Sequence, residues 1–447
     1  MVLSISICIG AFFVLLWWLR RDSISLGLPI AYLFSLLLIH VPGAYVHVAT
    51  DYLPFTDMVA AGIRFTAIGS VCFVLGVMTA GYLTGRGRIP AAPEPDSWKF
   101  SMFCLVGGWF FTYGLSSLHS IPSLGAAVDR AGGIWMLGVV LGMRAAMQKI
   151  DLKMVVFWFG ALMVYPILML LLGGFLSYGS AAVIVVLSAL TIPMRSPLRL
   201  LFCVVVTVFL GLNVFVNYFA HRDEIRDEVW GRAPLEDRVN ATLDVFRDFK
   251  WFDSDNPEQV TALNARLNQN YFAGLAAARI NAGSVDYLYG RSLWEGVFSF
   301  VPRALWPEKP VVAGSPMIVA EMTGLTLNKD TSFGVGNVME FQINFGIPGL
   351  VIGFFVLGFL IRAFDKRAAK AIRSGDFGGA IVGFLTAVAL IQPNGSIVEL
   401  CMGSAGALGG ALGWRWLWGR WSGRSAKRAH VPRRLSTQPI GHRYPRP

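Results

Sequence analysis

Charged residues are scarce in this chain. Only 15% of its 447 residues are Asp, Glu, Lys or Arg, whereas 55% are hydrophobic. A soluble domain of this length carries far more charge, so the composition excludes an ordinary soluble protein. Runs of about 18–25 apolar residues recur along the chain, and this is the length that crosses a bilayer as a helix. The sequence therefore predicts an all-α, polytopic membrane protein.

Motifs for soluble catalysis and for metal binding are also missing. The chain has no Gly-x-x-x-x-Gly-Lys-Ser/Thr loop, no His-Glu-x-x-His and no Gly-x-Ser-x-Gly. Its five cysteines fall inside apolar runs without metal-ligand spacing, and its six histidines are scattered. We therefore expect neither a metal nor another cofactor.

The apolar runs predict about eleven membrane spans. They lie near residues 2–19, 24–47, 58–83, 100–117, 132–148, 154–173, 178–194, 200–220, 343–362, 377–392 and 396–418. The first run has no basic residue before it and is followed by Arg20 and Arg21. This pattern is typical of a first helix with its N-terminus outside, rather than of a cleavable signal peptide.

Basic residues gather on alternate connections between these runs, and the tail after Trp418 carries eight Lys or Arg and no acid. Cytoplasmic loops of membrane proteins are enriched in Lys and Arg. Eleven spans bring all the basic clusters to one side, with the N-terminus extracytoplasmic and the C-terminus cytoplasmic. The net charge of +11 then reflects membrane topology and anionic lipid, and it does not indicate nucleic-acid binding.

One connection, residues 221–342, is long and polar. It holds 17 of the 27 acidic residues against 12 Lys or Arg, so we place it on the extracytoplasmic side. Asn256-Pro257-Glu258 predicts a helix start, and apolar residues recur from Val260 to Ile280 at helical spacing. Residues 237–249 form a weaker amphipathic stretch, and the aromatic residues of 293–306 suit a membrane surface. We expect a small helical cap.

The chain thus divides into four predicted parts. Residues 1–220 form an N-terminal transmembrane bundle of about eight helices. Residues 221–342 form the extracytoplasmic cap, and residues 343–418 form the C-terminal transmembrane helices. Residues 419–447 form a basic, proline-containing cytoplasmic tail that we expect to be disordered.

Two ionisable residues lie inside predicted spans near the outer face, namely Arg64 in the third span and Glu399 at the start of the last one. Such groups are costly in hydrocarbon and usually face a cavity or a partner. In the functional interpretation, Arg64 binds a diphosphate and Glu399 is a catalytic or orienting carboxylate. In the structural alternative, they pair with each other or with Asp57.

The cap contributes four further cationic candidates. Arg303 and Lys309 belong to VPRALWPEKP (301–310), a run that three prolines and Trp306 stiffen. Arg279 stands at the end of the strongest predicted cap helix, where it can equally cap the last carbonyls, and Arg291 follows it. A guanidinium held at headgroup depth suits a lipid-linked phosphate, because its planar set of donors matches phosphate oxygens.

Glu340 is the only carboxylate in TSFGVGNVMEFQINFGIPG (331–349), a glycine-rich run that enters the ninth predicted span. In the functional interpretation it is a general base on the same side of the membrane as Arg303. In the alternative it is a helix-start carboxylate that interacts with the helix dipole.

Together, VPRALWPEKP and the Thr331–Gly349 run resemble the Wzy-type polysaccharide polymerases, many of which have a Pro-Arg-x-Leu-Trp-Pro-x-Lys-Pro run before a Thr, Gly, Glu and Asn-Phe-Gly run. The resemblance implies a metal-independent glycosyltransferase with an all-helical C-type fold in the bacterial inner membrane. Such an enzyme joins oligosaccharide repeat units carried on undecaprenyl diphosphate, as donor and acceptor, at the outer face. It implies Arg303, Glu340 and Arg279 as catalytic residues and Arg64, Arg291 and Lys309 as diphosphate ligands.

The partners implied by the resemblance are membrane lipids, a chain-length regulator and a flippase, and the product is an O-antigen, capsule or exopolysaccharide. Two alternatives stay open at this point. The related O-antigen ligases transfer glycan to lipid A and use a loop histidine, whereas this chain has no histidine between His221 and His430. The other alternative is a polysaccharide or lipid flippase without covalent chemistry.

Overall fold

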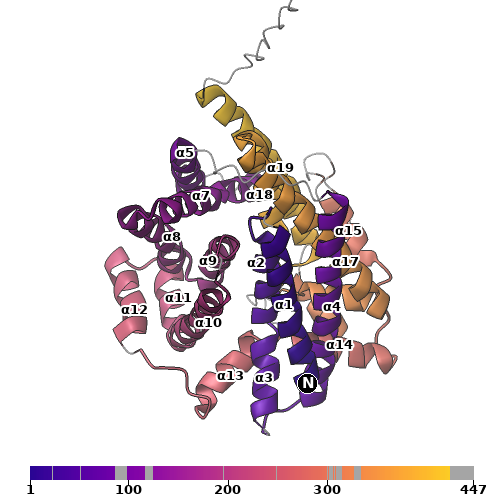
Figure 1. The fold of residues 1–447 in the computed structure, drawn as a ribbon. Helices are drawn as coiled ribbons and strands as arrows, with labels where there is room; N and C mark the ends of the chain where they lie inside the picture. Colours follow the sequence, from indigo (N-terminus) through magenta and orange to yellow (C-terminus); the bar gives the residue numbers. More distant parts are fainter. Residues whose placement is uncertain are drawn as a thin grey trace, which may run out of the picture.

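The computed structural model describes residues 1–22, 24–50, 52–85, 98–115, 124–194, 196–247, 249–299, 301, 306, 308, 315–326 and 334–422. Every regular element in these ranges is a helix, which confirms the predicted all-α class. Seven helices in the described part of the chain are long and apolar enough to cross a membrane (Figure 1). The protein is therefore all-helical, with several helices of the kind that a membrane protein has.

The helices of the first half are α1 (Val2–Asp22), α2 (Leu28–Leu38), α3 (Val41–Ala49), α4 (Thr56–Leu83), α5 (Trp98–Trp109), the π-helical turn η1 (Phe110–Gly114), α6 (Leu124–Gly132), α7 (Ile134–Lys149), α8 (Leu152–Gly173), α9 (Leu176–Thr191) and α10 (Pro197–Ala220). The polar connection forms α11 (Arg222–Trp230), α12 (Leu235–Arg247), α13 (Pro257–Arg266), α14 (Asn270–Asn281), α15 (Arg291–Ser299) and α16 (Ser315–Thr323). The chain continues through α17 (Asn337–Arg373), α18 (Phe377–Ala389) and α19 (Ile397–Trp421).

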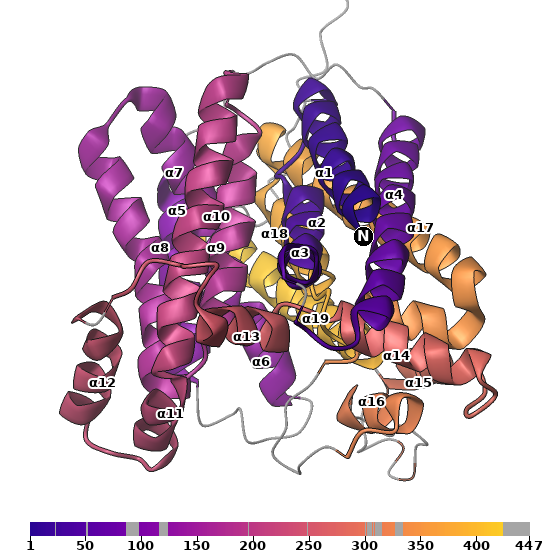
Figure 2. The same cartoon turned by 90° about the horizontal axis from the view of Figure 1, so that it is seen from below.

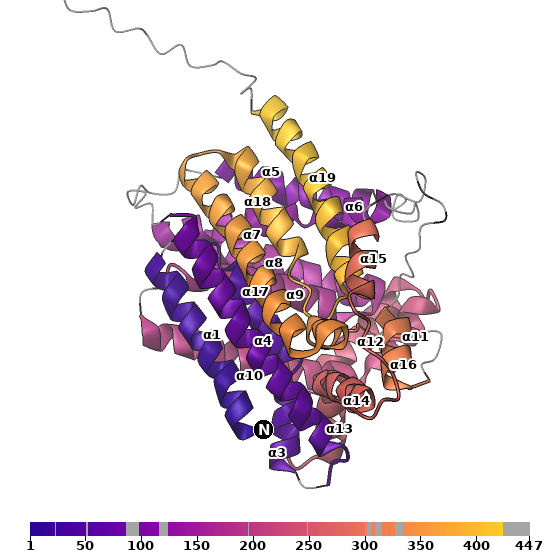
Figure 3. The same ribbon diagram turned by 90° about the vertical axis from the view of Figure 1, so that its right-hand side faces the viewer.

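Helices α1, α4 and α17 run side by side and form the centre of one half of the molecule (Figure 3). The contact between α4 and α17 is close because small residues line it. A Cβ atom at Gly358 would collide with the backbone of Phe73, and one at Gly76 with the backbone of Phe355. Glycines that let two helix backbones approach closely are typical of helix pairs in membranes, where packing replaces the hydrophobic effect.

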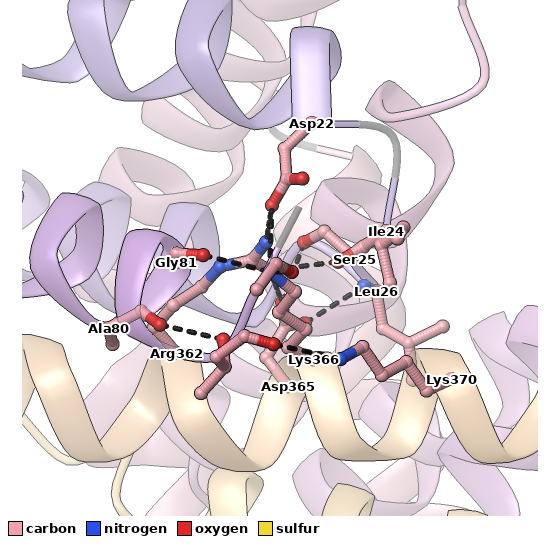
Figure 4. A network of polar contacts seen from close by, with 12 residues as sticks. Asp22, Ile24, Ser25, Leu26, Ala80, Gly81, Arg362, Asp365, Lys366 and Lys370 are labelled. Atoms are coloured by element: carbon pink, nitrogen blue, oxygen red, sulfur yellow. Dashed lines mark hydrogen bonds and ion pairs between the residues drawn. The ribbon is translucent and has the colours of Figure 1, made fainter. Parts of the chain in front are cut away.

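A buried ion cluster joins one end of these helices (Figure 4). Arg362 of α17 is fully buried and donates to Asp22 at the end of α1 and, at 2.6 Å, to Asp365. The Asp365 carboxylate also accepts from the Ser25 hydroxyl and the Leu26 backbone, each at 2.8 Å. The charges are thus satisfied by partners from α1, α17 and the segment before α2, as buried charges require.

Lys366 extends this cluster to α4. Its ammonium group donates to the carbonyl oxygens of Gly81 and Gly85, each at 2.9 Å. These carbonyls lie at the C-terminal end of α4, where the helix leaves acceptors without partners. The C-terminal ends of α1, α4 and α17 therefore meet at one end of the bundle.

At its other end, α17 is broken. Phe345 (φ −142°, ψ 20°) and Gly346 (φ 63°, ψ −143°) depart from helical geometry and separate a short half-helix, residues 337–344, from the rest. The conformation at Gly346 is one that only glycine adopts readily. The ninth apolar run was expected to start at residue 343, but its helix begins at Asn337 and turns sharply at this glycine.

The polar connection is helical, as predicted, and Asn256 caps α13 through its side chain, which accepts from the backbone of Glu258 at 3.0 Å. The expected continuous helix from Val260 to Ile280 is wrong, because it divides into α13 and α14. The carbonyl of Leu267 accepts from Gly43, and the backbone N–H of Gln269 donates to Ile39, each at 3.0 Å. These bonds to the junction of α2 and α3 replace bonds within the helix.

The helices of this connection spread across the molecule. Figures 1 and 2 place α11 and α12 on one side, beside α8 and α10, and α14 and α15 on the other side, beside α4 and α17. Helix α16 packs on α14 (Figure 2). The connection is therefore in contact with both halves of the bundle.

Candidate functional site

The half-helix of α17 is held by the segment that precedes α19. The side chain of Asn337 accepts from the Tyr32 hydroxyl at 2.8 Å and donates to the Gly395 carbonyl at 3.0 Å. Its backbone N–H donates to the Pro393 carbonyl at 2.9 Å. An asparagine that is buried and uses both its donor and its acceptor fixes the start of the half-helix.

Glu340 lies one turn further on and is fully buried. Its Oε2 accepts from the backbone N–H of Ile397 at 2.7 Å. Ser292 of α15 also interacts with the carboxylate, and Asn344 donates to the Ser292 hydroxyl at 2.8 Å. Glu340 therefore lies inside the protein and joins the starts of two helices, whereas the sequence indicated only that it lies just before the ninth predicted span.

Glu399 lies one turn into α19 and is exposed. It forms a capping box with Ser396, since each side chain accepts from the other residue's backbone N–H, at 3.2 and 3.1 Å. Its Oε1 accepts from the Ser315 hydroxyl of α16 at 3.2 Å. The capping box fixes the side chain while leaving the carboxylate open to solvent.

Arg130, at the end of α6, approaches the same helix. Its guanidinium donates to the Gln392 side chain at 3.1 Å and passes Gly403, where a Cβ atom would lie 3.2 Å from Nε. Burial lowers the pKa of Arg130, and the carboxylates of Asp129 and Glu399 oppose this change. The guanidinium is thus a partly desolvated cation, and such a group interacts strongly with anions.

Arg279 and Arg291 meet at a single residue of α16. Arg279 donates to the backbone carbonyl of Glu321 at 3.2 Å, and Arg291 forms an ion pair with the Glu321 carboxylate at 2.5 Å. The Arg291 and Glu321 side chains are 49% and 41% exposed, so solvent reaches this pair. The structure therefore brings two of the predicted arginines together.

Glu295 connects this pair to Glu340. It lies one turn after Arg291 on α15, and Gly296 beside it packs against Ile397 of α19. Partial burial raises the pKa of Glu295, the Glu321 carboxylate raises it further, and Arg291 opposes both. Glu295 and Glu399 both lie near enough to repel the charge of Glu340.

These residues lie on helices that pack against one another near the starts of α15 and α19, and we name them the charged row. Figure 3 shows the elements that carry it: α15 lies against the first turns of α19, with α6 on one side and α14 and α16 on the other. Its members are Arg130, Arg279, Arg291, Glu295, Glu321, Glu340 and Glu399. It combines one exposed guanidinium group, that of Arg291, and two partly buried ones with the exposed carboxylate of Glu399, which suits an anionic leaving group and a proton acceptor.

Three predicted site residues remain, namely Arg64, Arg303 and Lys309. Arg64 lies on an exposed face of α4, and among the described residues it has no hydrogen bond or ion pair with Glu399 or Asp57, so the predicted pairing is wrong. Arg303 and Lys309 lie outside the described residues.

Sequence reasoning missed Arg130. Arg130 lies between two apolar runs, and the residues around it match none of the catalytic or binding motifs considered above. The one sequence feature that points to Arg130 is its position within one turn of the predicted outer end of the span at residues 132–148.

No protein-family model, curated protein or solved structure matches this chain.

Proposed function

We propose that the protein is a polysaccharide polymerase that joins undecaprenyl-diphosphate-linked oligosaccharide repeat units at the outer face of the bacterial inner membrane. The observation that carries the proposal is the charged row, because the helix whose first turn holds the exposed Glu399 carboxylate packs against α15, which carries Arg291, and against α6, which carries Arg130. The resemblance of residues 301–350 to Wzy-type polymerases is the second support.

The proposal includes eleven membrane crossings with the N-terminus outside. Supporting this count, shorter apolar helices such as α9 and α18 lie between the long ones, and α2 with α3 forms one apolar segment. The basic residues Arg362, Lys366 and Lys370 then mark the cytoplasmic end of α17, and the charged row lies at its opposite, outer end.

In the proposed reaction, an acceptor sugar hydroxyl attacks the anomeric carbon of the donor glycan. A carbon–oxygen bond to the acceptor forms, and the bond to the lipid diphosphate breaks, so the diphosphate leaves with the electron pair. Negative charge grows on the leaving group, and fixed guanidinium groups stabilise such charge. Arg279 and Arg291 are suited to this role because both contact the same residue, Glu321, and because Arg291 is exposed and Arg279 is partly exposed.

The acceptor hydroxyl must lose its proton, and an exposed carboxylate is the natural base. Glu399 meets this requirement, because it is open to solvent and its position is fixed by Ser396 and Ser315. Glu340, which the sequence suggested as the base, is fully buried and accepts from Ile397. We therefore propose Glu340 as a positioning residue, which holds the first turn of the helix that carries Glu399.

The experiment is an assay with purified protein in lipid nanodiscs and one synthetic lipid-linked oligosaccharide as the only glycan. A polymerase makes a ladder of products that differ by one repeat unit. A reaction that starts only after lipid A is added indicates a ligase, and no covalent product with either acceptor indicates a transporter. Either of these two results would contradict the proposal.

A further inference from the structure

A second group of arginines lies apart from the charged row. Arg222 and Arg226 belong to α11, and Arg266 is the last residue of α13. We name these three the basic cluster. Figure 2 places α11 on the opposite side of the molecule from α15 and α16, so the basic cluster lies apart from Arg291, Glu295 and Glu321 of the charged row.

Aromatic rings support the three guanidinium groups. The Cζ atoms of Arg222 and Arg266 lie 5.4 and 5.7 Å from the centre of the same ring, that of Phe219. The Cζ atom of Arg226 lies 5.0 Å from the Phe175 ring and 5.2 Å from the Trp230 ring. Cation–π contacts involve the flat face of a guanidinium, and its N–H donors lie in the plane, where they are available to an anion.

The acidic residues of α11 lie on a different face from its arginines. Arg222, Arg226 and Trp230 are spaced by four residues and share one side of the helix, whereas Asp223, Glu224, Asp227 and Glu228 follow on the next side. The one ion pair between them joins Arg222 Nε to Asp223 at 3.4 Å, and the Asp223 side chain is 88% exposed.

The cluster is only partly neutralised within the protein. The buried Nε of Arg226 has no hydrogen-bond partner among the described residues. Burial lowers the pKa of Arg266, the charges of Arg222 and Arg226 lower it further, and Asp223 opposes them. The repulsion among the three cations therefore exceeds what the nearby carboxylate offsets, and an anion from outside would relieve it.

The surroundings favour an anion that belongs to a lipid. Phe219 stands at the C-terminal end of α10, a helix long and apolar enough to cross a membrane. The same phenylalanine lines an open hollow of about 510 Å³. The other lining residues are Pro257, Glu258, Thr261, Ala262 and Ala265. Apart from Glu258 and Thr261, these lining residues are apolar, so the hydrocarbon chain of a lipid could pack in the hollow beside the arginines.

We propose that the basic cluster binds the diphosphate headgroup of a membrane lipid. Three guanidinium groups match a diphosphate better than the single charge of a phospholipid phosphodiester, and each can form charge-assisted hydrogen bonds with phosphate oxygens. The site is separate from the charged row, so the protein holds two lipid diphosphates at once. That the second lipid is the acceptor substrate rests on the proposed function, whereas the binding itself does not.

The test is the stoichiometry of binding of radiolabelled undecaprenyl diphosphate to the full-length protein in nanodiscs. We expect two molecules per wild-type chain. Arg222→Gln/Arg226→Gln should lose one of them, with at least a tenfold weaker affinity at that site, and Arg266→Gln, which changes an exposed side chain, should weaken the same site. Arg279→Gln/Arg291→Gln should lose the other one.

Arg247→Gln is the matched control, because Arg247 lies on the neighbouring helix α12, is 63% exposed and pairs only with Asp244 among the described residues. It should keep both sites. Two bound molecules in Arg222→Gln/Arg226→Gln would overturn the proposal, as would displacement of the second molecule by excess phosphatidylglycerol. Absence of glycan transfer with two molecules bound would instead count against the proposed function alone.

Discussion

The Glu340 carboxylate accepts a hydrogen bond from the backbone N–H of Ile397 at 2.7 Å and so joins the half-helix of α17 to the first residue of α19. Ionised acceptors form the stronger hydrogen bonds of proteins, and a helix start favours a negative charge. This contact fixes the helix on which Glu399 lies.

Replacing Glu340 tests this positioning role. Glu340→Ala leaves the Ile397 N–H without its partner and should lower the free energy of unfolding by about 1–3 kcal/mol. Glu340→Gln keeps a neutral acceptor and should cost about 1 kcal/mol. Thermal unfolding in detergent measures both. Equal stability of Glu340→Ala and the wild type would contradict the role, and so would a Glu340→Gln variant that is fully folded yet completely inactive.

Glu399→Gln separates catalysis from helix capping. Glutamine can replace glutamate in a capping box, so the thermal stability should stay within a degree or two of the wild type. Loss of the base should lower the turnover about 10²–10⁴-fold. Ser396→Ala is the control, since it removes the cap at a cost of about 1 kcal/mol and leaves the carboxylate in place. Wild-type turnover in Glu399→Gln would refute the role of Glu399.

Arg291 and Glu321 form an ion pair that solvent reaches, and such pairs add little to stability. Arg291→Gln should therefore fold normally but lower kcat/KM about 10–100-fold, because a charged hydrogen bond to the diphosphate is lost. Arg291→Lys should also be poor, since a point charge does not replace the planar donors. Glu321→Gln should stay active. If Glu321→Gln lost as much activity as Arg291→Gln, the pair would be structural.

The ion cluster of Figure 4 leads to a separate prediction about the free energy of unfolding. Asp365→Asn removes a charge that faces the fully buried Arg362 and should cost about 3–5 kcal/mol. Asp376→Asn is the control, because Asp376 is an exposed cap of α18 and asparagine caps helices equally well. Unfolding in increasing concentrations of denaturant compares the two variants. Equal midpoints would mean that the cluster does not stabilise the bundle.

The proposed orientation can be tested by labelling. Tyr289 precedes α15 and is 71% exposed, and Ile150 lies between α7 and α8 and is 90% exposed. An impermeant maleimide added to intact spheroplasts should label Tyr289→Cys and not Ile150→Cys, and after lysis it should label both. Labelling of Ile150→Cys before lysis would place the charged row on the cytoplasmic side.

Hydropathy and cap residues predicted the helices well. The apolar runs correspond to helices of the described structure, and Asn256-Pro257 predicted the start of α13, because these signals are local in sequence. The break at Gly346 and the burial of Glu340 were not predictable in this way. The burial of Glu340 depends on the segment around Ile397, which lies far along the chain and packs on the half-helix only in the fold. At Gly346 the neighbour is Tyr287, which is also distant in sequence.

For the candidate site, too, some residues were predictable from the sequence and others were not. The sequence singled out Arg279, Arg291, Glu340 and Glu399, and the structure puts them on helices that pack together, with the two arginines in contact with one residue, Glu321. It gave no reason to add Arg130, which reaches Gln392 only because α6 packs against α19. Nor did it show that Arg64 lies on an exposed face of α4, since that depends on which neighbours cover the helix.

The most direct measurement follows both products of the proposed reaction. Purified protein in nanodiscs receives one lipid-linked oligosaccharide, and the released undecaprenyl diphosphate is counted against the repeat units added to the growing glycan. The proposal predicts a ladder, with one diphosphate released for each unit added and with both products lost in Glu399→Gln. Intact substrate after incubation with folded wild-type protein, or diphosphate release without chain growth, would contradict it.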